Sequence, residues 1–218
     1  MQNNIVKHAL KTALVMIVFG VAGTFILAIT NENTKAPIAQ SEALARMDLF
    51  RQILPENLHD NDLLKDTIQI APSDLLGDVD LTVHRARINH QPAAVILESV
   101  APDGYSGNIK LLIAVKYDGS LSGVRVLAHK ETPGLGDYIE IARDTWIKQF
   151  DHQSLLTKNE KDWQVKKDGG TFDYMAGATI TPRAVVKAVH KALQYYAENK
   201  DKLFSENLKV GKSGVSHE

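Results

Sequence analysis

The sequence of 218 residues contains no cysteine. Disulfide bonds, thiolate-bound metals, iron–sulfur clusters and a cysteine nucleophile are therefore excluded, as is haem attached through a C-x-x-C-H motif. Any redox chemistry must use a bound organic cofactor or a metal without thiolate ligands. The eight histidines form no H-x-x-x-H or H-E-x-x-H pair, so the sequence does not predict a metal site.

An excess of charge of either sign is also missing, because the formal net charge is −1 at pH 7. The chain thus has no overall positive field to attract nucleic acid, and it contains no zinc-finger or RNP-like pattern. It also lacks a Walker lysine after its glycines, a G-x-G-x-x-G fingerprint and a G-x-S-x-G elbow. We therefore expect one main domain with no nucleic-acid partner and without a common nucleotide-binding or hydrolase motif.

The longest apolar run, residues 12–31, carries no charged side chain. About 20 residues is the length of helix that spans the hydrocarbon core of a bilayer. A cleaved signal peptide is the alternative, but the run is longer than a usual signal-peptide apolar region and no clear A-x-A site follows it. Lys7 and Lys11 precede the run, whereas Glu32 and Lys35 follow it. The positive-inside rule therefore predicts a single-pass protein with a cytoplasmic N-terminus and its main domain on the other side of the membrane.

The remainder of the chain predicts an α+β fold, in which helices pack on an antiparallel sheet. A short polar linker is expected after the anchor, followed by a helix that ends before Pro55. Four β-rich runs separated by turn residues then indicate a meander, at residues 78–89, 92–100, 108–117 and 121–130. Two further helices are expected at residues 137–150 and 182–198.

These elements suggest four parts of the chain. They are the N-terminus and anchor (1–31), a linker, helix and first strand region (32–91), the domain core (92–198) and a polar C-terminal tail (199–218). Trp146 and Trp163 are more simply explained as core residues than as rings stacked on a ligand. Tyr105 and Lys130 are expected to be structural or to face solvent.

A first glycine-containing loop, HKETPGLGDYIE at residues 129–140, follows the last expected strand. Pro133 fixes one backbone dihedral, while Gly134 and Gly136 permit positive φ and let a planar ligand approach the main chain. The alternative is an ordinary strand-to-helix turn with Asp137 at the N-cap of the next helix. Spacing alone favours this ordinary turn.

A second loop, TFDYMAGATIT at residues 171–181, leads into the last helix. Thr181 is expected at the N-cap and Pro182 at the first helical position. Gly177 and Ala178 leave room for a bulky group beside Thr179, next to helix amides that favour phosphate. Spacing alone favours a helix start without any ligand.

Two stretches favour ligand binding at these loops instead, because together they resemble the FMN-binding domain family. DYMAGAT, residues 173–179, resembles the family sequence D-x-x-(S/T)-G-A-T, with Ala176 at the position that usually holds Ser or Thr. APDGYSGNIKLLIAVKYDGSLSGVRVLAHKETPGLGD, residues 101–137, is similar to the other half of the domain. Their order and the single anchor resemble the G subunits of Rnf-type (Rsx) electron transport complexes, over roughly residues 1–198.

The resemblance implies covalent FMN, attached to Thr179 through a phosphoester bond. The attachment is expected to need a separate flavin transferase that uses FAD and a divalent metal. Asp173 would help the transferase to recognise or activate the acceptor, and Gly177 and Ala178 would keep the hydroxyl reachable. The residues implied to line the flavin ring or its tail are Glu131, Thr132, Gly134, Leu135 and Gly136.

The function that the resemblance implies is electron relay within a membrane complex that couples electron transfer to ion translocation. The chain would be a redox subunit of a translocase rather than a stand-alone enzyme, with other integral-membrane redox subunits as partners. Two alternatives belong to other classes, namely a membrane-tethered flavin reductase with its own acceptor and a non-catalytic interaction module. An interaction module would leave Thr179 unmodified.

Overall fold

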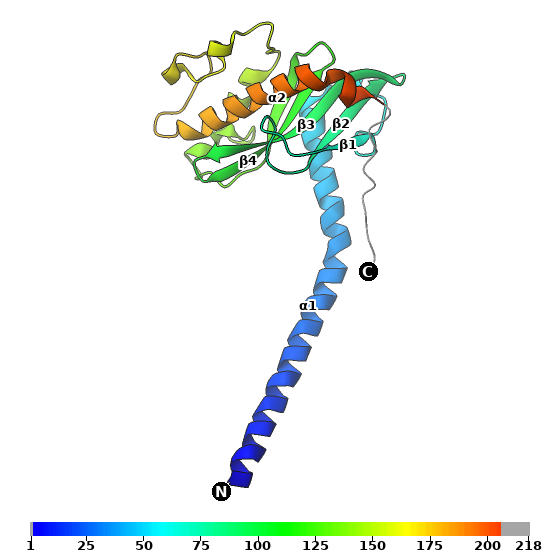
Figure 1. The fold of residues 1–218 in the computed structure, drawn as a ribbon, viewed down its shortest axis with the longest axis vertical. Helices are drawn as coiled ribbons and strands as arrows, with labels where there is room; N and C mark the ends of the chain where they lie inside the picture. The colour runs from blue at the N-terminus through cyan, green and yellow to red at the C-terminus, as the bar shows by residue number, and fades with distance from the viewer. Residues whose placement is uncertain (1, 206–218) are drawn as a thin grey trace. The chain divides into compact units, whose positions relative to one another are not determined.

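The α+β fold expected from the sequence is confirmed in a computed structural model, which describes residues 2–205 (Figure 1). The chain divides into two compact units, Met1–Arg46 and Met47–Glu218. The long elements are α1 (Gln2–Ile53), β1 (Thr67–Ile70), β2 (Leu81–Ile88), β3 (Gln91–Gly104), β4 (Gly107–Lys116), β5 (Leu121–Ala128) and α2 (Ile180–Phe204). Five 3-10 helices join them, namely η1 (Glu56–Leu58), η2 (Gly136–Ile139), η3 (Trp146–Phe150), η4 (Glu160–Asp162) and η5 (Lys166–Asp168).

The first unit is helical from Gln2 onward, and α1 continues through the segment expected to be a polar linker. Pro37 lies inside this helix. A proline removes one intrahelical hydrogen bond. The helix can continue through Pro37 nevertheless, because the residues on both sides are already helical and no new helix has to be nucleated. The predicted break between the anchor and the next helix is therefore wrong.

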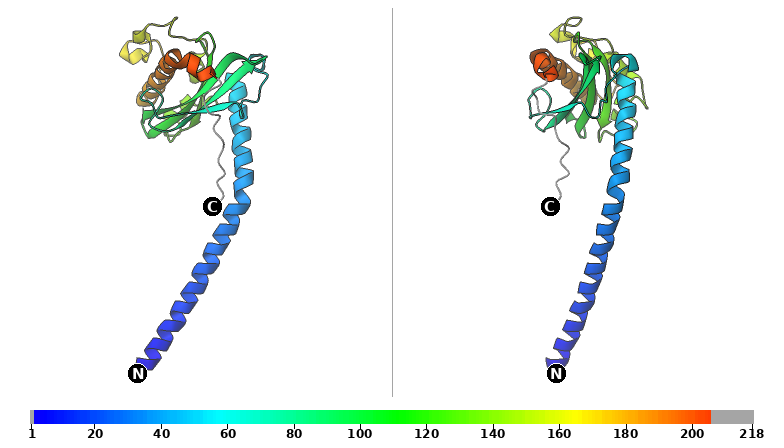
Figure 2. Two further views of the ribbon diagram at one scale, coloured as in Figure 1. Left: turned by 45° about the vertical axis from the view of Figure 1, so that its right-hand side comes forward. Right: turned by 90° about the vertical axis from the view of Figure 1, so that its right-hand side faces the viewer.

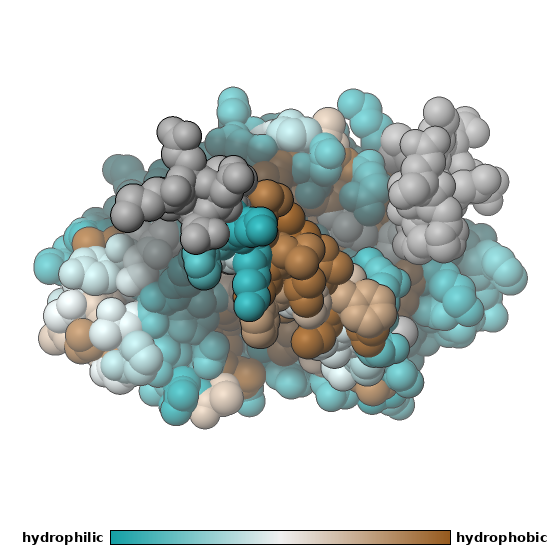
Figure 3. Space-filling model, turned by 90° about the horizontal axis from the view of Figure 1, so that it is seen from below, coloured by the Kyte–Doolittle hydropathy of each residue, from teal (hydrophilic) through white to brown (hydrophobic). Residues whose placement is uncertain are grey.

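Among the described residues, one stretch is long and apolar enough to cross a membrane, and it lies in α1. Large exposed apolar side chains of α1 include Leu14, Met16, Phe19 and Leu27. Figure 3 shows a patch of hydrophobic residues on the face of the molecule seen from below. The hydroxyls of Thr24 and Thr30 donate to carbonyls one turn earlier, at 2.9 Å each. These polar groups are thereby satisfied without water, as a membrane-spanning helix requires.

The second unit is built on one five-stranded sheet in the order β1-β2-β3-β4-β5, with every neighbouring pair antiparallel. The predicted meander is thus confirmed. β1 was not expected, because its four residues are too short to show a clear alternation and pair with β2 alone. The β3–β4 hairpin turns at Tyr105 and Ser106, where Gly107 has φ of +111°.

α2 covers one face of the sheet, and the last turns of α1 cover the other (Figure 2). The core under α2 includes Ile109, Leu111, Ile113, Val185, Val189 and Leu193. The core on the opposite face is formed by Phe50, Ile53, Leu54, Leu63, Ala86, Ala94, Ile96, Leu112 and Ala114. Residues 47–54 are therefore part of the hydrophobic core of the domain.

Gly123 and Arg125 of β5 contact the end of α1. A Cβ atom on Gly123 would lie 3.0 Å from the Ile53 Cα, so any larger residue there would force the end of α1 to move by a few tenths of an ångström. Arg125 donates from Nε to the Gln52 Oε1 at 2.9 Å and from Nη2 to the Gln52 carbonyl at 3.2 Å. A guanidinium bound to a carbonyl of the last helical turn stabilises the helix C-terminus.

The helix expected at 137–150 is wrong, since this segment forms η2 and η3 with a turn between them. Asp144 accepts a hydrogen bond from the Trp146 N–H at 2.7 Å, and such a side-chain acceptor competes with helical hydrogen bonding. The helix expected at 182–198 exists but continues to Phe204, because Leu203 and Phe204 are buried. Residues 206–218 of the expected polar tail lie outside the described residues.

Candidate functional site

The two glycine-containing loops meet at a cavity of about 350 Å³. Its size lies within the range of small-molecule sites. Its lining comes from the β3–β4 hairpin, the loop after β5 and the start of α2: Tyr105, Glu131, Thr132, Leu135, Gly136, Gly177, Ala178, Thr179, Ile180 and Thr181. The structure thus brings together seven of the nine residues that the sequence suggested, which are Glu131, Thr132, Leu135, Gly136, Gly177, Ala178 and Thr179.

Glu131 connects the three segments that form the cavity. Its side chain is buried, its Oε1 accepts a hydrogen bond from the Ser106 N–H at 2.9 Å, and its Oε2 accepts one from the Thr181 hydroxyl. Both carboxylate oxygens are therefore already bound within the protein. This places Glu131 as a structural member of the cavity wall.

The backbone at Glu131 is held by His129. The Glu131 N–H donates to the His129 Nδ1 at 2.9 Å, so this ring nitrogen carries the lone pair. The Nε2 then carries the proton and donates to the Glu140 Oε1 at 2.8 Å. The loop after β5 is thus fixed at its start by the imidazole of His129.

The glycines of the two loops are required for different reasons. Gly134 and Gly177 have φ of +76° and +87°, a region that disfavours other residues, and a Cβ on either would meet open space. Gly136 has no such φ, but its Cβ would lie 2.8 Å from the Glu131 Oε2 and 2.9 Å from the Thr181 Oγ1. Space at Gly136 is therefore necessary for the hydrogen bond between these two residues.

The two threonines at the start of α2 have different roles, and the prediction of Thr181 as the N-cap is wrong. α2 begins at Ile180, so Thr179 takes the N-cap position, and Thr181 lies inside the first turn. The Thr181 hydroxyl is buried against Glu131. The Thr179 side chain is half-buried at the cavity, makes no capping hydrogen bond, and its hydroxyl has no partner among the described residues. Pro182 remains in the first turn, where its missing N–H costs nothing.

Two predicted residues do not line the cavity. Gly134 shapes the loop instead, and its N–H donates to the Asp137 Oδ1 at 2.8 Å. Asp173 is exposed and forms an ion pair with Lys166 at the other end of the second loop. A role of Asp173 therefore needs a partner molecule that approaches from outside.

Sequence reasoning missed Tyr105, Ile180 and Thr181 as lining residues. Tyr105 was expected to be structural or to face solvent, and its side chain is 69% exposed at the mouth of the cavity. Its position in the turn DGYSG was the available signal, since that turn lies inside the stretch that carries the resemblance. Trp146 and Trp163 are buried in the core, as predicted.

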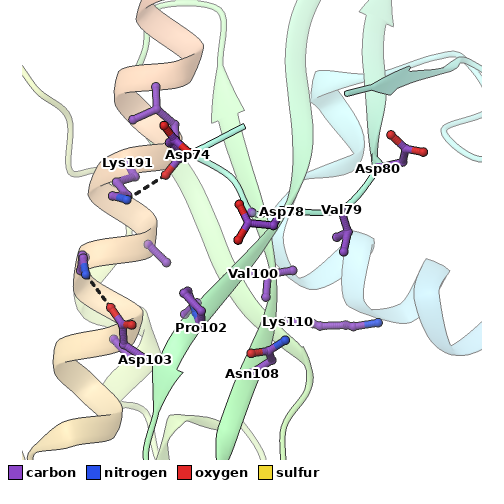
Figure 4. A pocket seen from close by; sticks show the side chains of 16 residues that line it. Asp74, Asp78, Val79, Asp80, Val100, Pro102, Asp103, Asn108, Lys110 and Lys191 are labelled. Carbon is purple, nitrogen blue, oxygen red and sulfur yellow. Dashed lines mark hydrogen bonds and ion pairs between the residues drawn. The ribbon is translucent and has the colours of Figure 1, made fainter. Parts of the chain in front are cut away.

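A second and larger cavity of about 810 Å³ lies between α2, β3 and the loop before β2 (Figure 4). Four aspartates and three lysines line it, and it contains none of the predicted site residues. Lys191 donates to the Asp74 carbonyl at 2.8 Å, and Lys187 forms an ion pair with Asp103, so two lysines connect α2 to its surroundings. The smaller cavity is therefore the candidate site, despite its size.

Two family models match this chain. Residues 104–194 match the model of the FMN-binding domain family, and residues 1–53 match that of the RnfG N-terminal region. The G subunit of the ion-translocating oxidoreductase complex of Pseudomonas aeruginosa (strain UCBPP-PA14) is 46% identical over 94% of this chain and 96% of that protein. The protein of the same name from Vibrio atlanticus is 41% identical over 92% of this chain and 96% of its own.

Among solved structures, the C subunit of the Na⁺-translocating NADH-quinone reductase of Parabacteroides distasonis is 22% identical, with a TM-score of 0.45. The match covers 66% of this chain and 79% of that one. The sequence matches alone decide the family, because they extend over nearly the whole length of both chains. The chain belongs to the family of G subunits of ion-translocating oxidoreductase complexes, and residues 104–194 are its FMN-binding domain.

Proposed function

We propose that this chain holds FMN covalently through Thr179 and relays electrons within a membrane complex that couples electron transfer to ion translocation. One observation carries the attachment site. The Thr179 hydroxyl lies at the cavity and makes no capping hydrogen bond, whereas the Thr181 hydroxyl is bound to Glu131. Of these two threonines, Thr179 is therefore the one whose hydroxyl is available for a covalent bond.

The cavity fits a flavin in the chemistry of its walls. Leu135 and Ile180 offer apolar side chains, and Tyr105 offers an aromatic ring at the mouth, which suits a planar ring system. The first amides of α2 lie beside Thr179 and form the positive end of the helix dipole, which favours a phosphate. The cavity thus offers apolar and aromatic side chains to the flavin ring and helix amides to its phosphate.

Attachment is a phosphoryl-group transfer to the protein. The Thr179 Oγ forms a bond to the flavin-side phosphorus of FAD, the pyrophosphate bond of FAD breaks, and AMP leaves. The hydroxyl proton is released to the AMP phosphate or to solvent, and no atom is oxidised or reduced. A separate flavin transferase with a divalent metal is the proposed catalyst, and Asp173 is the proposed contact that this enzyme recognises.

Once bound, the flavin supplies the redox chemistry, which the side chains of this cysteine-free protein do not provide. Leu135 and Ile180 line the cavity with apolar side chains that a flavin ring could contact. Glu131, with Thr181 and the Ser106 amide, keeps the three segments at a fixed separation. The residues of this chain thereby position the cofactor for neighbouring redox proteins of the complex.

The site is proposed to lie in the periplasm, with α1 as a retained anchor of the inner membrane. Lys7 and Lys11 before the apolar stretch support this orientation. Alkaline phosphatase fused after Glu218 should be active, and a cytoplasmic reporter at the same position should be silent. The reverse pattern would contradict the orientation.

The direct experiment on function is to denature the chain after co-expression with a flavin transferase. Yellow colour and flavin fluorescence that migrate with the denatured chain are expected for a covalent cofactor. A chain without flavin would favour the interaction module. Flavin that is released on denaturation would contradict the phosphoester bond.

A further inference from the structure

The loop that carries Thr179 has few hydrogen bonds of its own. Among the described residues, one hydrogen bond joins two backbone groups within residues 173–178. It runs from the Ala178 N–H to the Met175 carbonyl at 3.1 Å. The glycine in this loop, Gly177, adds conformational freedom. The loop conformation must therefore be fixed by other parts of the chain.

Tyr138 of η2 bridges the two ends of this turn. Its hydroxyl accepts a hydrogen bond from the Met175 N–H at 3.3 Å and donates one to the Ala178 carbonyl at 3.5 Å. Burial raises the pKa of Tyr138 to about 12, so the hydroxyl stays protonated and keeps both roles at neutral pH. Ala178 directly precedes Thr179, so this contact acts next to the acceptor residue.

Two residues of η3 hold the start of the same loop at Asp173. The Trp146 Nε1–H donates to the Asp173 carbonyl at 2.7 Å, and the Gln149 Oε1 accepts from the Asp173 N–H at 2.9 Å. The rings of Tyr138 and Trp146 pack edge to face, with centroids 5.6 Å apart. The segment that forms η2 and η3 thus makes four side-chain hydrogen bonds to the backbone of the loop.

We infer that Tyr138, Trp146 and Gln149 are positioning residues, which preorganise residues 173–179 for attack by the Thr179 hydroxyl on FAD. None of the three lines the cavity, so they act through the loop backbone and not on the flavin. Transfer to an oriented acceptor is faster because the loop does not have to be ordered during the reaction. This inference rests on the proposed covalent attachment at Thr179.

The test measures the initial rate of FMN attachment to the full-length flavin-free chain, with fixed transferase and FAD, by intact mass. Tyr138→Phe removes only the hydroxyl and keeps the packing against Trp146. Tyr196→Phe is the matched control, because Tyr196 is also buried and also donates to a backbone carbonyl, that of Tyr117 at 3.2 Å. We expect Tyr138→Phe to be slower by about two- to tenfold for each of the two hydrogen bonds that it loses, and Tyr196→Phe to match the wild type.

A second matched pair uses the tryptophans. Trp146→Phe removes the donor to Asp173, whereas Trp163→Phe removes a buried Nε1 that has no partner among the described residues. Attachment should slow in Trp146→Phe alone. Gln149→Leu should also slow it, and Gln149→Glu should restore the rate because it keeps an acceptor oxygen for the Asp173 N–H.

Thermal unfolding of the same flavin-free variants separates positioning from general damage. A positioning role predicts slow attachment in Tyr138→Phe at a melting temperature close to that of Tyr196→Phe. Wild-type rates in Tyr138→Phe, Trp146→Phe and Gln149→Leu would overturn the inference, as would equal slowing in the control variants. A wild-type chain that never gains the mass of FMN would overturn the proposed function as well, which distinguishes the two failures.

Discussion

The hydroxyl of Thr181 donates a hydrogen bond to the Glu131 Oε2 and joins the start of α2 to the loop after β5. Both side chains are buried, with exposed fractions of 1% and 4%. The residue expected to cap α2 is thereby committed to the wall of the cavity. Thr179, two positions earlier, lines the cavity, and its hydroxyl has no hydrogen-bond partner among the described residues.

This relationship predicts different stabilities for the two threonine variants. Thr181→Val leaves the Glu131 Oε2 without its buried donor and should lower the free energy of unfolding by about 1–3 kcal/mol. Thr179→Val removes a hydroxyl that has no described partner and should change it by less than about 0.5 kcal/mol. Urea unfolding of the flavin-free chains measures both. Equal losses would show that the Thr181 hydrogen bond contributes nothing specific.

A methyl group at Gly136 should disturb the cavity directly. Its Cβ would lie 2.9 Å from the Thr181 Oγ1, so Gly136→Ala must displace Thr181 or Glu131 and cost about 1–3 kcal/mol. The bound flavin fraction should fall as well. Gly169→Ala is the control, since Gly169 has φ of +90° and open space around its Cβ but lies at the C-cap of η5, away from the lining residues. Full flavin loading of Gly136→Ala would contradict the close approach.

The fold of the second unit should depend on the last turns of α1. Phe50→Ala removes a fully buried ring from the core beneath β2, β3 and β4 and should cost about 3–5 kcal/mol. A fragment that begins at Met47 should fold, whereas one that begins at Glu56 should not. Circular dichroism and urea unfolding of the two fragments measure this. A stable fragment from Glu56 would show that residues 47–54 are dispensable.

Much of this organisation is readable from the sequence. The apolar run, the meander and the two glycine loops have local patterns of residue type, and they appear where the patterns predict them. The contribution of residues 47–54 to the far side of the sheet has no such pattern, because it depends on Gly123 and Arg125, about 70 residues later. Local spacing cannot show a contact of that range.

The cavity shows the same limit at the level of single residues. Thr181 before Pro182 matches the pattern of an N-cap, and only the position of Glu131, 50 residues away, reveals its other partner. Tyr138, Trp146 and Gln149 likewise read as core or surface residues of a helix. Their hydrogen bonds to residues 173–178 become visible only when the tertiary fold brings the two segments together.

The pH dependence of stability should report on His190. Its ring stacks on Trp163 with centroids 5.2 Å apart, and burial lowers the pKa of His190 below its usual 6.5. The unfolded chain therefore takes up this proton first as the pH falls, and stability that is fully present above pH 6.5 is lost below it. His190→Gln should reduce the decline between about pH 7 and 5. An identical decline in both chains would exclude His190 as its source.

The central claim is the division of labour between Thr179 and Thr181, and intact mass under denaturing conditions tests it most directly. Each variant is co-expressed with a flavin transferase, and Thr179→Ser serves as the control that keeps a hydroxyl. The account predicts the added mass of FMN less one water in the wild type, no addition in Thr179→Val, and addition at least in part in Thr179→Ser and Thr181→Val. Covalent flavin in Thr179→Val together with none in Thr181→Val would contradict it and move the attachment site to Thr181.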